Sequence, residues 1–176
     1  MLADRVLEKI LWAEKFYSLS KDELLRNPEI SDLLRRLRAA IHDSRCEMAG
    51  TGIVGICRDC EQKEGGSCCG YGLEAYYDET LLLINLLLGV GLPKERAEST
   101  SCFFLSANGC GLLARHVICI NYVCEKITDR FHPQELASLR EKEGVEVELL
   151  FRLNEEMKKY IHVLVSNPGR SSFDLP

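Results

Sequence analysis

Residues 57–72 read CRDCEQKEGGSCCGYG and contain four of the nine cysteines of the chain. Four more cysteines follow, so that eight lie in the central part of the chain: Cys57, Cys60, Cys68, Cys69, Cys102, Cys110, Cys119 and Cys124. From Thr51 to Gly72 the helical spacing of apolar residues is lost and six glycines appear. Such a composition cannot supply a conventional apolar core. We therefore expect something other than side-chain packing to order this segment.

Three kinds of chemistry explain clustered cysteines: disulfides, a redox dithiol, or thiolates that bind a metal. Disulfides suit small secreted domains, but residues 1–17 mix charged with apolar side chains and predict no signal peptide. The number of cysteines is also odd, and a bridge between neighbouring Cys68 and Cys69 would strain the backbone. A thioredoxin-like pair needs a strand and a helix around Cys57 and Cys60, and the sequence predicts no such alternation. Metal binding in a cytoplasmic protein is the interpretation we favour.

The pair Cys57-x2-Cys60 has the spacing with which a tight turn brings two thiolates to one ion. Eight thiolates would fill two tetrahedral sites, or one cluster with spare thiols. Both Zn²⁺ and iron–sulfur clusters accept four thiolates, and the spacing matches neither common ferredoxin pattern. We favour zinc. The adjacent Cys68 and Cys69 keep an iron–sulfur cluster open, because two neighbouring residues bend onto one small ion only with strain.

The cysteine pattern also resembles a known family. Its features are Cys57-x2-Cys60, the Cys68-Cys69 pair, Cys102-Phe103-Phe104-Leu105, Gly109-Cys110, Arg115 and Cys119-x4-Cys124. Together they resemble the YkgJ-like family of zinc- or iron-chelating proteins, which is named for its CxxCxxCC motif. The resemblance covers residues 57–124 and implies a metal-chelating cysteine cluster.

The flanking segments predict a mainly α fold, in which helices flank an irregular, metal-organised cysteine-cluster centre with at most a small hairpin. Residues 1–50 are expected to form a helical segment, in which Ser20 and Glu23 open a second helix and Ser31 caps a third. The cysteine region spans residues 51–128, with a helix after Asp78 and a turn at Asn108-Gly109. One long helix is expected over residues 129–166, with Gly144 as a point of interruption, and a mobile tail over residues 167–176.

The net charge of −5 is spread without a long block, which predicts no nucleic-acid partner. The most apolar stretch, residues 81–92, is broken by Asn85 and too short to span a membrane. Among other candidates, His116 is more typical of a surface residue than of a ligand, and Cys46 of a free thiol. Glu74 and Asp78 adjoin the cysteines, but no catalytic pair stands out.

The sequence thus predicts a protein that binds metal ions, preferably zinc, in a structural or regulatory role. Four-thiolate sites leave no open position for a substrate, which favours a structural or regulatory role over catalysis. Whether the chain is an enzyme stays undecided. Two alternatives remain: an iron–sulfur protein of electron transfer or oxidoreductase type, and a helical interaction module stapled by metal that pairs with a partner protein or a second copy.

Overall fold

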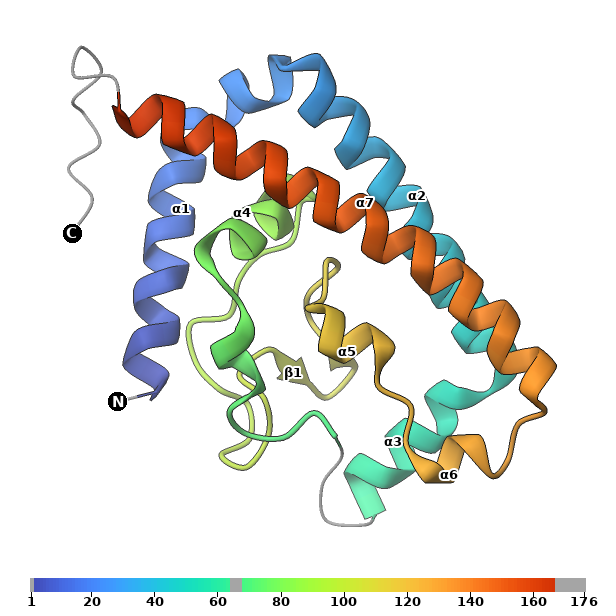
Figure 1. The fold of residues 1–176 in the computed structure, drawn as a ribbon. Helices are drawn as coiled ribbons and strands as arrows, with labels where there is room; N and C mark the ends of the chain where they lie inside the picture. Colours follow the sequence, from blue (N-terminus) through green and yellow to red (C-terminus); the bar gives the residue numbers. More distant parts are fainter. Residues whose placement is uncertain (1, 64–67, 167–176) are drawn as a thin grey trace.

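Helices account for most of the chain in this computed structural model, which describes residues 2–63 and 68–166 (Figure 1). The long helices are α1 (Leu2–Arg26), α2 (Pro28–Thr51) and α7 (Pro133–Ser166). The shorter ones are α3 (Ile53–Lys63), the 3-10 turn η1 (Leu73–Tyr76), α4 (Glu79–Leu87), α5 (Val117–Asn121) and α6 (Glu125–Thr128). Strands β1 (Leu105–Ser106) and β2 (Gly109–Cys110) form a hairpin. The prediction of a mainly α fold with a small hairpin is confirmed.

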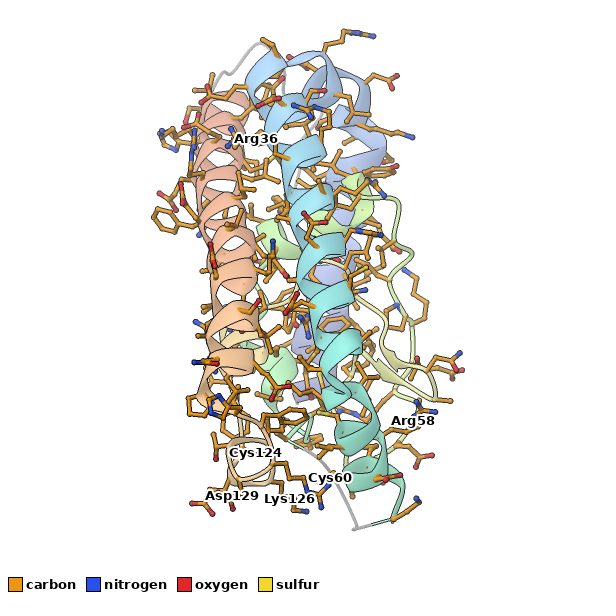
Figure 2. The ribbon with its side chains drawn as sticks, turned by 90° about the vertical axis from the view of Figure 1, so that its right-hand side faces the viewer. Arg36, Arg58, Cys60, Cys124, Lys126 and Asp129 are labelled. Atoms are coloured by element: carbon orange, nitrogen blue, oxygen red, sulfur yellow. The ribbon has the colours of Figure 1, made fainter. Side chains whose placement is uncertain are left out.

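Helices α2 and α7 lie side by side and run in opposite directions, as Figures 1 and 2 both show. Leucines spaced three and four residues apart on α2, such as Leu33, Leu34 and Leu37, are buried there, because they fall on one face of a 3.6-residue helix. On α7 the side chains of Leu153 and Met157 are completely buried in the same core. The pair forms one wall of the molecule, and the cysteine region lies against it.

The prediction of helix starts at Ser20 and Ser31 is wrong. Helix α1 continues without a break to Arg26, because Ser20 lies four residues after buried Phe16 and four before buried Leu24, on the same helix face. The next helix begins at Pro28 with Asn27 as its cap. The side chain of Asn27 accepts hydrogen bonds from two backbone amides at 3.0 and 3.2 Å, and proline suits the first helical turn.

The expectation of an irregular segment from residue 51 is also wrong in part, because α3 is a regular helix that carries Cys57 and Cys60. Gly52 ends α2 in the left-handed conformation at φ 85°, which glycine adopts without strain. The chain then turns into α3. Ile53 at its start is buried against Ile127 and Leu139, so a small apolar cluster orders this helix by packing.

Helix α4 lies between α1 and α7 (Figure 1), and most of its residues are buried. The side chain of Asp78 caps it by accepting a hydrogen bond from Leu81 N at 2.8 Å, as the sequence predicts. Buried Asn85 on α4 holds the segment that precedes α5. Its amide group donates to Ala114 O at 2.9 Å, and its oxygen accepts from Leu113 N and Ala114 N at 2.9 and 3.0 Å. Asn85, the polar residue within the apolar run, thus holds in place the backbone segment that leads to Arg115 and Cys119.

The long helix expected near the C-terminus is present as α7, and it passes through Gly144 without interruption. Its exposed apolar residues Val145, Phe151 and Val163 do not form one stripe, because Phe151 lies a third of a turn away from the line that joins the other two. No helix in the described ranges is both long and apolar enough to cross a membrane. The tail predicted over residues 167–176 lies outside the described residues.

Candidate functional site

The eight central cysteines come from six different parts of the fold. Cys57 and Cys60 lie on α3, and Cys68 and Cys69 come shortly before η1. Cys102 precedes the hairpin and Cys110 lies on β2. Cys119 lies on α5, and Cys124 is the residue before the first turn of α6. All nine cysteines of the chain are described, and each is a free thiol.

Cys57 and Cys60 are presented by a helix and not by the tight turn that their spacing suggested. Residues three apart lie on the same helix face, so α3 directs both thiols to one side. The ammonium group of Lys126 on α6 lies 3.6 Å from Cys60 Sγ. Figure 2 shows Cys60, Cys124 and Lys126 together at one end of the molecule. Lys126 is not among the residues predicted from the sequence, where its only signal is a positive charge two residues after Cys124.

In a second, more buried region, the segment that contains Cys69 contacts the segment that contains Cys102. Cys102 N donates a hydrogen bond to Cys69 O at 2.8 Å, and Gly70 pairs with Ser101 as an isolated antiparallel bridge. The hairpin then places Cys110 opposite Leu105. Backbone pairing therefore brings together residues that are far apart in the sequence, which is why their spacing alone did not indicate it.

Tyr77 contacts this inner region through its hydroxyl group. The side chain is buried; its hydroxyl donates to Cys119 Sγ at 3.7 Å and accepts from His116 N at 3.1 Å. His116 itself caps α5, because its Nδ1 accepts from Ile118 N at 3.2 Å. Burial lowers the pKa of His116, which favours the uncharged ring. The structure gives His116 a capping role, and Tyr77 is a residue that sequence reasoning missed.

The inner thiols are poor nucleophiles. Burial raises the pKa of Cys102 to about 12 and also raises the pKa values of Cys110 and Cys119. Burial raises the pKa of Cys57 as well, and the neighbouring thiol of Cys124 acts in the same direction. A reactive cysteine requires a lowered pKa, so these four thiols do not have the character of catalytic residues.

Cys68 differs from them. Its side-chain hydrogen bond with Cys69 lowers its pKa, although burial and the nearby thiols of Cys57 and Cys124 oppose the change. The two adjacent thiols therefore interact with each other, and Cys68 is also within electrostatic range of cysteines on α3 and before α6.

Arg115 is the cation best placed among the thiols. Its charge lowers the pKa values of Cys57, Cys110 and Cys119 against the effect of burial. Its Nε atom is buried and, within the described parts of the chain, has no hydrogen-bond partner. Arg45 on α2 lies nearby and donates to Leu112 O at 2.6 Å, and it too favours the thiolate of Cys110. Positive charge is thus available where buried thiolates would need it.

The carboxylates near the cysteines have structural partners. Glu74 is fully buried and forms an ion pair with Arg96, while its Oε2 accepts from Gly72 N at 3.0 Å. These contacts lower the pKa of Glu74 despite its burial. Asp78 caps α4, as described above. Neither residue is placed as a general base.

Over the residues that the structure describes, no three or more His, Cys, Asp or Glu side chains are grouped so that they could hold a metal ion. The eight thiols are neighbours in two regions of the fold, but their side chains do not converge on one point. A metal site there requires movement of cysteine side chains.

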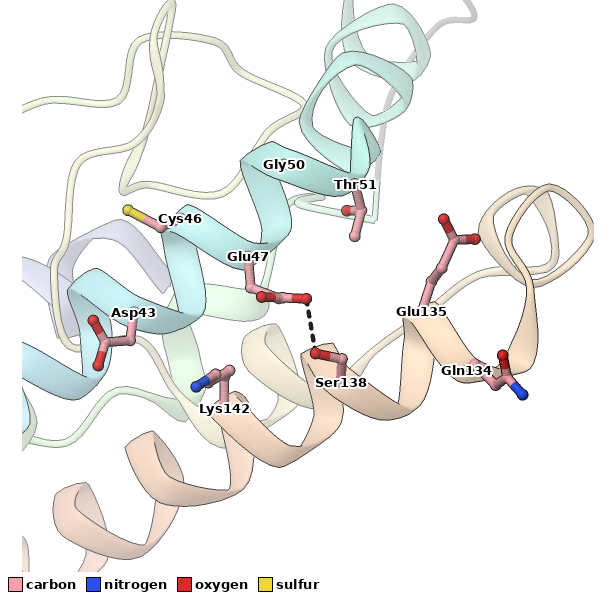
Figure 3. A pocket seen from close by; sticks show the side chains of 9 residues that line it. All are labelled: Asp43, Cys46, Glu47, Gly50, Thr51, Gln134, Glu135, Ser138 and Lys142. Carbon is pink, nitrogen blue, oxygen red and sulfur yellow. Dashed lines mark hydrogen bonds between the residues drawn. The ribbon is translucent and has the colours of Figure 1, made fainter.

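A surface hollow of about 730 Å³ lies between the end of α2 and the start of α7 (Figure 3). Asp43, Cys46, Glu47, Gly50, Thr51, Gln134, Glu135, Ser138 and Lys142 line it. Ser138 Oγ donates to Glu47 Oε1 at 2.9 Å across it. Cys46 is exposed, and its Sγ lies 3.7 Å from His42 Nε2. The hollow is open, most of the residues that line it are polar or charged, and none of the eight central cysteines is among them.

Comparison with known proteins gives no relative: no family model, no curated protein and no solved structure matches the chain.

Proposed function

We propose that the chain binds zinc through thiolates of the eight central cysteines, in a structural or regulatory role. The observation that carries this proposal is Arg115, a cation among thiols whose Nε is buried without a hydrogen-bond partner in the described structure. A zinc ion bound by four thiolates keeps an excess of negative charge. A guanidinium group beside the thiolates offsets that charge, and the sulfur atoms are acceptors for its N–H groups.

The donor set fits zinc in its chemistry. Thiolates bind Zn²⁺ strongly, and metal binding displaces the thiol protons even where burial raises the pKa. The side chains must converge for this to occur, so zinc uptake draws together segments that now lie side by side. Because four thiolates close the coordination shell, the site binds metal and takes no substrate. Nine free thiols also suit the reducing cytoplasm.

The first test is the metal content and visible absorption spectrum of protein purified without oxygen. We expect about two zinc ions per chain, since a structural zinc site uses about four thiolates, and no colour. Protein without metal, which also fails to bind added zinc, would refute the proposal. Iron with sulfide and a brown colour would replace zinc with the iron–sulfur alternative, which the neighbouring thiols of Cys68 and Cys69 support.

A second test uses the charge of Arg115. Replacement of Arg115 by Met should weaken zinc affinity by about 10- to 100-fold, which is the usual effect of removing a residue that supports a metal ligand. Arg58→Met is the matched control, because Arg58 lies on α3 between two of the cysteines but is exposed to solvent and directed outward (Figure 2). Competition against a chromogenic chelator measures both affinities. If the two substitutions changed zinc affinity equally, Arg115 would have no specific role beside the thiolates.

A further inference from the structure

The two apolar clusters of the fold divide the cysteines. The larger cluster, built by α1, α2, α4 and α7, contains Cys102 and packs against Cys110 and Cys119. The smaller cluster is built on Ile53 and Ile127, with Leu139, and packs against Cys57 and Cys124. These five thiols therefore belong to two separately packed regions.

Hydrogen bonds and chain position place Cys69 in the region of the larger cluster and Cys60 in the region of the smaller cluster. The carbonyl of Cys69 accepts the 2.8 Å hydrogen bond from Cys102 N, and the bridge of Gly70 with Ser101 continues this pairing. Cys60 lies one helical turn after Cys57, and Lys126 at its thiol comes from α6, which starts after Cys124. Cys69 is also within electrostatic range of Cys57, so it lies at the border between the regions, and its backbone pairing decides the assignment.

Cys68 is the last of the eight. It is exposed and lies within electrostatic range of Cys57 and Cys124. The larger region already holds Cys69, and adjacent side chains leave the backbone in different directions, so both reach one small ion only with strain. If the adjacent pair is divided between the two regions, each region receives four thiols and the strain is avoided.

We infer that the chain has two separate zinc sites, an inner site of Cys69, Cys102, Cys110 and Cys119 and an outer site of Cys57, Cys60, Cys68 and Cys124. This inference rests on the proposed function. Each site takes up one Zn²⁺ and forms four zinc–sulfur bonds, and the protons of the thiols pass to the solvent. No oxidant or reductant takes part.

The surroundings of the two sites predict different rates of zinc exchange. Around the inner site, Cys102 is buried in the larger core and the buried hydroxyl of Tyr77 donates to Cys119. Opening this site disturbs the main core of the fold. The outer site includes exposed Cys68, and the Lys126 contact with Cys60 is open to solvent. Local opening of α3 and α6 requires less free energy than opening of the core, so the outer zinc exchanges first.

The test is chelator challenge of the zinc-loaded full chain, followed by alkylation of the released thiols and mass spectrometry. We expect release in two phases whose rates differ by about tenfold or more. When one zinc has left, the thiols of the outer site should be alkylated and those of the inner site protected. Tandem fragmentation distinguishes label on Cys68 from label on Cys69. Labelling of both residues in the same phase would overturn the division while zinc binding stands, whereas a chain that binds no zinc would fail at the proposed function.

Two substitutions outside the ligand set give an independent check. Lys126→Met should accelerate the fast phase by about 10-fold and leave the slow phase unchanged, and Tyr77→Phe should accelerate the slow phase alone by a similar factor. Far-ultraviolet circular dichroism confirms that each variant is folded before the challenge. If either substitution changed both phases equally, the two zinc ions would share one cluster, and the inference would be wrong.

Discussion

Replacement of Asn85 by Leu tests the connection between the helical core and the cysteine region. Asn85 is fully buried on α4, and its side chain makes four hydrogen bonds. One of them goes to Leu81 O in the same helix at 3.0 Å. The other three satisfy the backbone of Leu113 and Ala114, directly before Arg115. Leucine has the same branching and the same number of side-chain heavy atoms and keeps the helix, but it makes none of these bonds.

The loss of stability follows from the groups left without a partner. Each buried backbone group without a hydrogen bond costs about 1–3 kcal/mol, so the three groups of Leu113 and Ala114 together cost about 3–9 kcal/mol. Burial of the apolar leucine side chain recovers about 2 kcal/mol. We therefore expect a decrease of about 4 kcal/mol in the free energy of unfolding, or a fall in Tm of about 8–16 °C for a domain of this length.

Urea unfolding, followed by circular dichroism with a zinc chelator present, measures this change without a contribution from metal. Asn121→Leu is the matched control, because Asn121 is exposed on α5 and should change stability by less than about 0.5 kcal/mol. A decrease below about 1 kcal/mol for Asn85→Leu would show that water or a small shift of residues 112–114 satisfies these groups. The role given to Asn85 would then be refuted.

Three further predictions concern single side chains. Glu74→Gln should destabilise the protein at neutral pH and reduce its loss of stability in acid. The pKa of Glu74 is lowered from 4.5 in the folded state. Its contribution to the free energy of unfolding is therefore present above pH 4.5 and is lost as the pH falls through the pKa of the folded state. Urea midpoints of both proteins between about pH 7 and pH 3 should therefore converge; parallel curves would contradict this. Arg45→Met should lower the free energy of unfolding by about 1–3 kcal/mol, because two backbone carbonyls lose their donor, and an unchanged urea midpoint would argue against it. Cys46→Ser should alter neither zinc content nor stability, since Cys46 is exposed and apart from the other eight, and a loss of zinc on elemental analysis would place it among the ligands.

The helical part of the fold could be predicted because its signals are local. Pro133 and the apolar spacing after it indicate α7, and Asp78 indicates the start of α4. The errors at Ser20 and Ser31 arose where a residue suited to capping lies within a helix. Tertiary burial decided the first case, and the stronger cap at Asn27 decided the second.

The arrangement of the cysteines could not be predicted in the same way. Which thiols are neighbours depends on the bridge between Gly70 and Ser101 and on the packing of α3 against α6, and both join residues distant in sequence. The residues that support the thiols, Tyr77 and Arg45, have no motif around them. A signal did exist for the buried polar residues of α7. Glu143 lies four residues after Leu139 and Glu146 lies four residues before Leu150, within the apolar face of the helix.

The regular structure of α3 changes the role that a metal would have in this protein. A segment of glycines and cysteines without a core would need metal to fold at all, and its zinc would be permanent. Here Ile53 packs against Ile127 and Leu139, so apolar contacts help to order α3, and the helix presents Cys57 and Cys60 on one face. Zinc bound by a helix that apolar contacts also order would carry a smaller share of the free energy of folding than zinc that orders a segment without a core. On the proposal of two separate zinc sites, we therefore expect the zinc of the outer site to exchange readily, as a regulatory metal would.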